Sequence, residues 1–98
     1  MRKQTGFSET TEQYLDAYRS ILNTMVEGMT SAELSDSISY NFIVQMIPHH
    51  RAAIEMSENV LKYITDDSLR EIASRIITEQ TQSINDMERI ESSCSELV

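Results

Sequence analysis

The sequence predicts an all-α fold, an antiparallel bundle of three long helices. The chain of 98 residues holds only two glycines and one proline, which leaves little material for turns and favours a few long elements. Apolar residues also recur at alternating spacings of four and three through three segments, as in helices that pack against one another. A chain of this length forms one domain, here residues 1–98.

The first helix is expected over about residues 9–29. Thr10, with Gln13 three residues later, matches a capping box, and Ser8 is a second candidate for the cap. The apolar stripe of this helix consists of Thr11, Leu15, Tyr18, Leu22, Met25 and Met29. A stripe with this spacing faces a helical partner. The polar run over residues 30–35 then forms the first connection.

The second helix is expected over about residues 36–63 and contains the only proline. Pro48 has no N–H to donate to the Val44 carbonyl, and its ring crowds that carbonyl, so a helix passing through it must bend. The alternative is a new helix starting at Pro48, but Ile47 would then be the cap and has no side-chain acceptor. Because the apolar phase continues across the proline, we predict one helix kinked at Pro48.

The third helix is expected over about residues 67–92. The preceding run, residues 65–68, supplies a short turn and several side chains that cap helices, with acidic charge at the positive end of the helix dipole. Its stripe consists of Leu69, Ala73, Ile76, Gln80, Ser83, Met87, Ile90 and Cys94. Short connections on both sides of the second helix make the sequential helices antiparallel neighbours.

Charge and composition limit the partners and the compartment that the chain is expected to have. Eight basic residues stand against 16 acidic ones, for a net charge of -8, which disfavours nucleic acid and anionic membrane surfaces. No apolar run is long enough to cross a membrane. No signal peptide is evident, and the single cysteine fits a reducing compartment. We therefore expect a cytoplasmic protein as the sequence is written, or an exported one if a leader has been removed.

Both histidines follow Pro48 directly, in the middle of the second helix. Depth in an antiparallel bundle can be estimated by reflecting residue numbers about each turn. A turn near residue 65 places Met46 opposite Ile84, and a turn near residue 33 places Pro48 opposite Tyr18. One polar layer is therefore expected to hold Tyr18, His49, His50, Gln80 and Ser83.

The chemistry of this layer has two interpretations. Met46 lies one helical turn before the histidines and Met56 two turns after His49, and a thioether with two imidazoles suits Cu(I). Two buried neutral histidines, hydrogen-bonded to Tyr18 and Gln80, would explain the same layer without a metal. Di-iron chemistry of the ferritin type is not expected, because it needs core-facing glutamates and no acidic residue falls on a stripe.

The second and third helices resemble a bacterial family, the domain of unknown function numbered 305. The residues that carry the resemblance are Phe42, Met46-Ile47-Pro48-His49-His50, Ala53, Met56, Ile76, Ile77, Gln80, Ile84 and Met87. The resemblance implies a ferritin-like helical bundle, often exported, with copper binding or resistance in some members. It implies a ligand role for Met46, His49, His50, Met56 and Met87.

The chain departs from the pattern of this family in two places. Ser83 stands where the family commonly has a glutamate, and Arg51-Ala52 replace the commoner Gln-Gly. The first departure removes a charged ligand from any site in this layer.

A spare apolar flank is also expected, made of Ile21, Ile43, Ile47 and Ile77. Such a flank predicts a homodimer or a higher homo-oligomer held by helix packing. Two functions follow from the sequence: a Cu(I)-binding module, or a structural oligomerisation domain whose histidines form a hydrogen-bonded layer. No nucleophile with a neighbouring base is evident, so we do not expect an enzyme.

Overall fold

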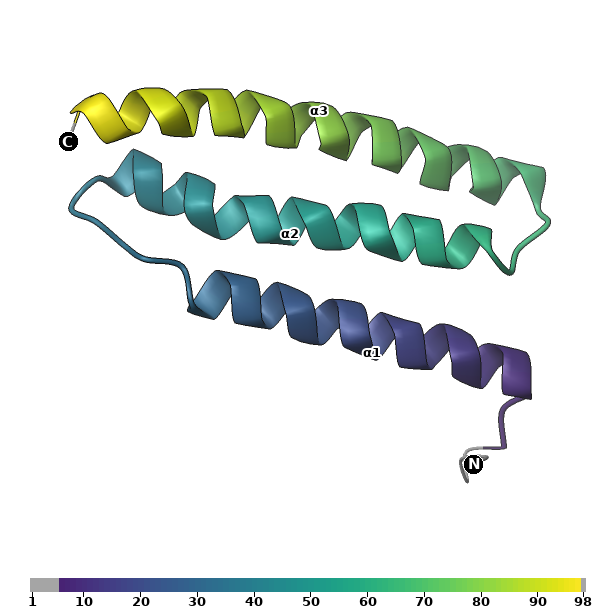
Figure 1. Cartoon of the computed structure of the whole chain (residues 1–98). Helices are drawn as coiled ribbons and strands as arrows, with labels where there is room; N and C mark the ends of the chain where they lie inside the picture. The colour runs from purple at the N-terminus through teal and green to yellow at the C-terminus, as the bar shows by residue number, and fades with distance from the viewer. Residues whose placement is uncertain (1–5, 98) are drawn as a thin grey trace.

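The structure, a computed structural model, describes residues 6–97, with side chains through residue 93. It consists of α1 (Glu9–Thr30), α2 (Ile38–Leu61) and α3 (Asp67–Leu97), each antiparallel to the next (Figure 1). No strand occurs in the described part of the chain, and the predicted all-α fold is confirmed. α3 continues to Leu97, beyond the end expected near residue 92.

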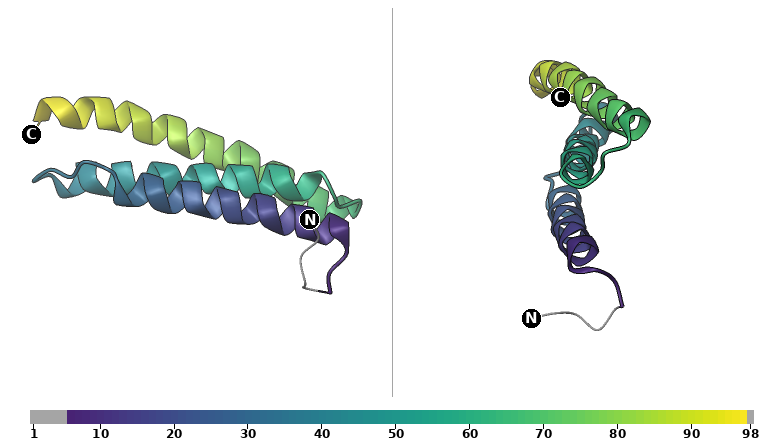
Figure 2. Two further views of the ribbon diagram at one scale, coloured as in Figure 1. Left: turned by 60° about the horizontal axis from the view of Figure 1, so that its bottom comes forward. Right: turned by 90° about the vertical axis from the view of Figure 1, so that its right-hand side faces the viewer.

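The three helices form a single open layer with α2 in the middle. The principal extents are 52 × 30 × 14 Å, and the end-on view shows the helices in a row (Figure 2). Within residues 6–97, α2 packs against both neighbours, whereas α1 and α3 do not come within contact distance of each other. The molecule therefore has two seams, α1–α2 and α2–α3, and two broad faces.

Side-chain caps begin each helix. The Ser8 side chain accepts from the Thr11 amide, so Ser8 is the cap of α1 rather than the Thr10–Gln13 box. The Ser37 side chain accepts from the Tyr40 amide at 3.1 Å and caps α2. Asp66 accepts from the amide of Leu69 at 2.8 Å at the start of α3, where its charge also favours the positive end of the helix dipole.

α2 continues through Pro48 without interruption. This confirms the prediction of one helix in place of a new start at the proline. A bend at Pro48 stays a prediction, based on the missing N–H and the crowded carbonyl of Val44.

The α2–α3 seam contains the apolar core. Ile43 and Ile47 of α2 and Ile84 of α3 are buried together, and Tyr40, Ile54 and Met87 pack against them. Ile43 and Ile47 were expected on a spare flank, and that prediction is wrong: they face α3 within one chain. The position of Ile84 agrees with the predicted register of these two helices, because Ile84 was expected opposite Met46.

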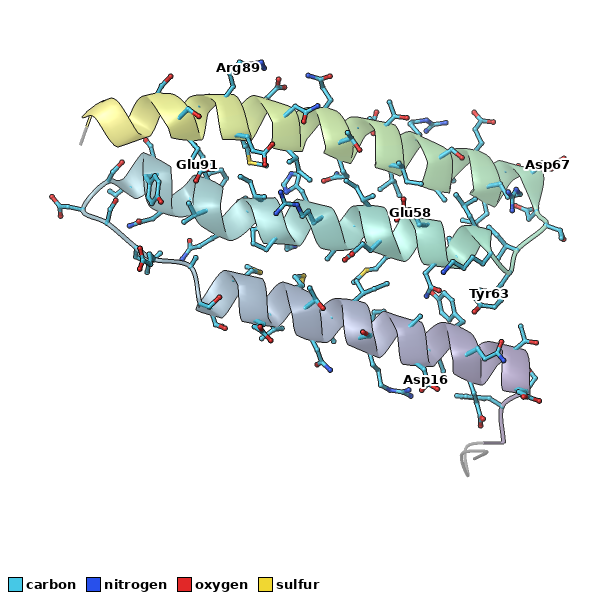
Figure 3. The ribbon with its side chains drawn as sticks, in the orientation of Figure 1. Asp16, Glu58, Tyr63, Asp67, Arg89 and Glu91 are labelled. Carbon is cyan, nitrogen blue, oxygen red and sulfur yellow. The ribbon has the colours of Figure 1, made fainter. Side chains whose placement is uncertain are left out.

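The α1–α2 seam depends on close approach and polar contact. A Cβ at Gly28 would lie 3.0 Å from the Cβ of Pro48, so the backbone of α1 approaches the proline ring directly. Asn59, which is 4% exposed, donates from Nδ2 to the Tyr14 carbonyl at 3.1 Å. The rings of Tyr14 and Tyr63 meet edge to face at 6.0 Å, and Figure 3 shows Tyr63 between the two helices.

The register of this seam differs from the predicted one. Gly28, and not Tyr18, lies against Pro48. Tyr18 is ten residues away along α1, which corresponds to about 15 Å of helix. The predicted opposition of Pro48 and Tyr18 is therefore wrong. It assumed that both connections are tight turns, and the extended segment over residues 31–37 is not (Figure 1).

The two faces of the layer differ in charge. On one side of the layer, Arg51 of α2 pairs with Glu88 of α3 at 3.2 Å. Glu55 and Lys62 of α2 lie on the same side. We call this side of the layer the charged face. On the other side Thr11 of α1 lines an apolar pocket with residues 60, 63 and 64 of α2. This apolar face, as we call it, carries the following residues at helical spacing: Leu15, Tyr18, Leu22, Val26 and Met29 of α1, Phe42, Met46, His49, Ala53 and Val60 of α2, and Ile72, Ile76, Ser83, Met87 and Ile90 of α3.

None of the helices between residues 6 and 97 combines the length and apolar character needed to cross a membrane.

Candidate metal site

Both histidines lie in the helical turn that follows Pro48. Adjacent residues of an α-helix point about 100° apart, yet the ring centroids of His49 and His50 are 6.0 Å apart, with their planes inclined by 61°. His49 is exposed and His50 is half-buried. The two imidazoles are therefore close enough to bind one metal ion, and both are accessible to solvent.

The main chain of the preceding turn fixes the orientation of His50. Its Nδ1 lies 2.9 Å from the carbonyl oxygen of Met46. Because a carbonyl oxygen only accepts, Nδ1 of the neutral ring carries the proton and donates it, which leaves the lone pair of Nε2 free. Histidines that bind metals usually donate their other ring N–H to a carbonyl or carboxylate, and that bond sets tautomer and orientation. His50 has this arrangement.

The methionines that the resemblance selects lie in different places. Met46 is half-buried one turn before the histidines. Met56 is also half-buried and lies seven residues after His49, on the same side of α2. Helical side chains lean toward the N-terminus, so Met56 leans toward His49. Met87 of α3 packs against the isoleucine core of the α2–α3 seam.

The supporting polar residues do not form one hydrogen-bonded layer. Gln80 and Ser83 are half-buried on α3, and Tyr18 is exposed on α1, displaced from the level of Pro48. In the described part of the chain, no hydrogen bond joins Tyr18, Gln80 or Ser83 to either imidazole.

The donors available near the histidines are imidazoles and thioethers. Among residues whose side chains are described, no group of three or more His, Cys, Asp or Glu side chains could hold a metal ion. Structural zinc sites and di-iron sites draw their ligands from these four residue types. A metal at this position would therefore need methionine sulfur, which soft ions such as Cu(I) accept.

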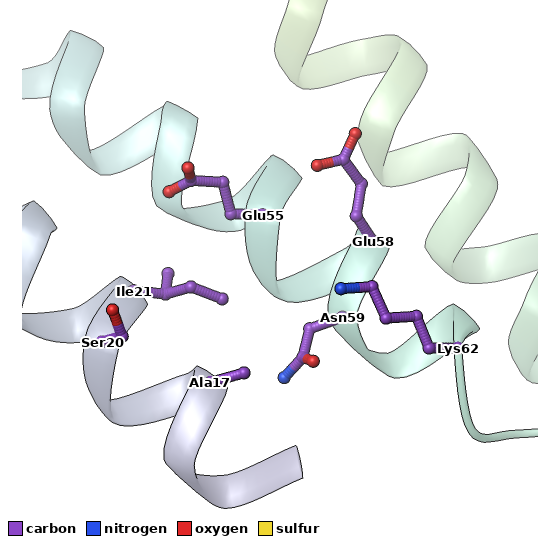
Figure 4. A pocket seen from close by; sticks show the side chains of 7 residues that line it. All are labelled: Ala17, Ser20, Ile21, Glu55, Glu58, Asn59 and Lys62. Carbon is purple, nitrogen blue, oxygen red and sulfur yellow. The ribbon is translucent and has the colours of Figure 1, made fainter. Parts of the chain in front are cut away.

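A second polar feature, a groove of about 490 Å³, lies on the charged face between α1 and α2. Figure 4 shows its lining, which is made of Ala17, Ser20, Ile21, Glu55, Glu58, Asn59 and Lys62. Asn59 Oδ1 is buried without a hydrogen-bond partner. Sequence reasoning missed Asn59. Its only signal is its spacing of seven residues from Ala52, which is also buried, so the two share the side of α2 that faces α1.

Comparison with known proteins identifies the family of the chain. A search of curated proteins gave no significant match. The family model described as domain of unknown function (DUF305) matches residues 3–91, nearly the whole chain. The match spans all of α1 and α2 and most of α3. The chain therefore belongs to the DUF305 family.

Proposed function

We propose that this protein is a Cu(I)-binding helical module that handles or buffers copper, with His49, His50 and Met46 as the primary ligands. The observation that carries the proposal is the hydrogen bond from His50 Nδ1 to the Met46 carbonyl. This bond leaves the lone pair of His50 Nε2 free to bind a metal. A second imidazole, that of His49, and the thioether of Met46 in the preceding turn lie on the same helix. Met56 and Met87 are proposed as additional ligands.

The residues present fit a soft ion. Two imidazoles and a thioether match the preference of Cu(I) for nitrogen and sulfur donors in small numbers. The centroid separation of 6.0 Å suits two rings on one ion, since imidazole nitrogens bind metals at about 2 Å. Thioethers are poor ligands for zinc, so Met46 favours Cu(I) over Zn(II).

Competition with a Cu(I) chelator of micromolar affinity tests the proposal. All proteins carry Cys94→Ser, because a free thiol binds Cu(I) by itself. The parent protein should remove copper from the chelator at a stoichiometry near one per chain. Replacing both His49 and His50 with alanine should abolish this competition, whereas Met46→Leu should weaken it about tenfold or more.

Two comparisons make the result specific. Met46→Leu should leave Zn(II) binding unchanged, and circular dichroism should show the same helix content in every variant. A parent protein that fails to compete with the chelator at neutral pH would show that the ligand assignment is wrong.

The second candidate function is a structural module that forms a homodimer or a higher homo-oligomer. It is favoured by the large apolar side chains that a single chain leaves exposed on its apolar face, such as Phe42 and Ile90. In that case the histidines serve packing and register, and the copper titration shows no saturable site.

A further inference from the structure

The apolar face is wide and carries few charges. Its lines of side chains from α1 and α2 contain no Asp, Glu, Lys or Arg, and the line from α3 contains one, Glu79, between Ile76 and Ser83, although the chain has 8 basic and 16 acidic residues. The ion pair between Arg51 of α2 and Glu88 of α3 lies on the charged face. A side of three helices with so few charges is the pattern of a surface that packs against protein.

A single chain does not cover this face. Phe42 is 58% exposed, Ile90 is 52% exposed and Val26 is 48% exposed, and they come from three different helices. The layer is 14 Å thick between Cα extremes, so no second layer shields them. Stable domains pack at least two layers of secondary structure around a core, and here the second layer is missing from one chain.

The exposed area supports the same conclusion. The accessible surface of the chain is 6964 Å². A compact protein of 11.2 kDa exposes about 5,700 Å² by the usual scaling of area with mass. The excess of about 1,300 Å² exceeds the roughly 800 Å² that each partner buries in an interface of standard size.

We propose that a second copy of this chain covers the apolar face, face to face and about a two-fold axis. A two-fold interface pairs a surface with itself, and a face with so few charges can do so with little repulsion between like charges. The net charge of -8 then lies on the outer sides of the pair. An acidic chain is a poor match for an anionic lipid surface. This proposal rests on the second candidate function and names its surface.

The two-fold axis would pass near His49. His49 stands at the middle of α2, the central helix of the layer, so the greatest overlap of two such faces brings the two copies of His49 near each other. Met46 lies on the same face, one turn away. The partner would therefore supply further imidazole and thioether donors to the candidate metal site.

Sedimentation equilibrium in the presence of a chelator tests the interface without the metal. The wild-type chain should sediment at twice its mass of 11.2 kDa at tens of micromolar. Phe42→Glu and Ile90→Glu should each weaken association by at least about a hundredfold, because a carboxylate buried without a partner is strongly unfavourable. Leu34→Glu is the matched control: Leu34 is 61% exposed but lies in the connection after α1, and its replacement should change nothing.

Circular dichroism should show intact helices in the two variants, since both side chains are exposed in one chain. A wild-type monomer at these concentrations overturns the proposal. So does a dimer that both variants leave as tight as the wild type, which would place the interface elsewhere. Copper competition is scored separately, so loss of metal binding with an intact dimer overturns only the ligand assignment.

Discussion

The two seams of α2 are built differently although they share one helix. Toward α3, aliphatic side chains interdigitate: Ile43 and Ile47 are buried against Ile84. Toward α1, the contact depends on a missing side chain at Gly28 and on a hydrogen bond from Asn59. The first seam draws its stability from buried apolar area. The α1–α2 seam depends on the fit between particular atoms. For the same buried area, a substitution there should therefore cost more than one in the α2–α3 seam.

The connections explain why the seams differ in register. Arg70 of α3 donates to the carbonyl oxygens of Leu61 and Ile64 at 2.8 and 2.9 Å. These bonds satisfy carbonyls at the end of α2 and fix the turn between α2 and α3. The connection over residues 31–37 is bonded to the end of α1 through the Ser31 amide and the Glu27 carbonyl, and to α2 through hydrogen bonds between Ser35 and Asn41. A connection of seven residues does not by its length set the level of α1, and the two helices meet where Gly28 lies against Pro48.

The largest effect is expected in the α2–α3 seam. Ile47→Ala removes a side chain that is 6% exposed and should lower the free energy of unfolding by about 2 to 5 kcal/mol, from lost transfer energy and the cavity left behind. The control is Ile38→Ala, at the exposed start of α2, which should cost less than about 0.5 kcal/mol. Urea denaturation measures both. Equal losses would contradict the assignment of the core to this seam.

Asn59→Asp tests the polar contact of the α1–α2 seam. The new carboxylate would be buried beside the Tyr14 carbonyl, with Lys62 of the same groove as the neighbouring cation, and should cost about 2 to 3 kcal/mol at neutral pH because burial outweighs the attraction of a solvated ammonium. Burial raises the pKa of such a carboxyl, so the loss should disappear as the pH falls below the ordinary aspartate value of about 3.9. Denaturation at pH 7 and pH 3.5 measures it.

Asn59→Leu is the matched control for this variant. It removes one hydrogen bond together with the unpartnered Oδ1, two changes that oppose each other. Its stability should depend little on pH. A pH-independent loss in both variants would mean that packing, and not charge, decides the fit at this position.

Gly28→Leu tests the close approach on which the same seam depends. Even a Cβ at this position lies 3.0 Å from the Pro48 ring, so a larger side chain must push α1 away from α2. We expect a loss of about 1 to 3 kcal/mol, as for other overpacked sites. Thr24→Leu, one turn earlier on α1 and exposed, should be neutral or slightly stabilising because leucine is the better helix former. Thermal unfolding distinguishes the two.

The elements of the fold could be predicted from the sequence because they depend on local signals. Capping side chains, the scarcity of turn residues and apolar spacing predicted all three helices. The apolar spacing also predicted that α2 continues across Pro48. The packing could not be predicted as well. A stripe shows which side of a helix is apolar, but it does not show whether a neighbour in the same chain covers it. Two of the four residues expected on a spare flank, Ile43 and Ile47, form the core.

The candidate site was predictable in part for the same reason. His49, His50 and Met46 are neighbours in sequence on one helix, so their proximity needs no tertiary information. Tyr18 was placed by the length of a connection, and that estimate was wrong by ten residues. The hydrogen bond from His50 to the Met46 carbonyl depends on a side-chain rotamer that no spacing reveals.

The smallest expected effect lies on α3, away from both seams. Asp86 accepts hydrogen bonds from Arg89 and from Gln82, and the Arg89 bond is the larger cause that lowers the pKa of Asp86 below its usual 3.8. Because the folded chain holds this proton less tightly than the unfolded chain, the resulting stabilisation is present above pH 3.8 and is lost as the pH falls through the folded value. Arg89→Gln should move the pKa of Asp86 back toward 3.8 and reduce the change of stability with pH in that acidic range. NMR titration of the Asp86 carboxyl gives the direct measurement.

Since Asp86 and Arg89 are exposed to solvent at their charged groups, salt should reduce the shift in the pKa of Asp86. The free energy of unfolding at pH 7 should differ little between the wild type and Arg89→Gln. A large loss at pH 7 would show that Arg89 supports the α2–α3 seam, which its pairing within α3 argues against.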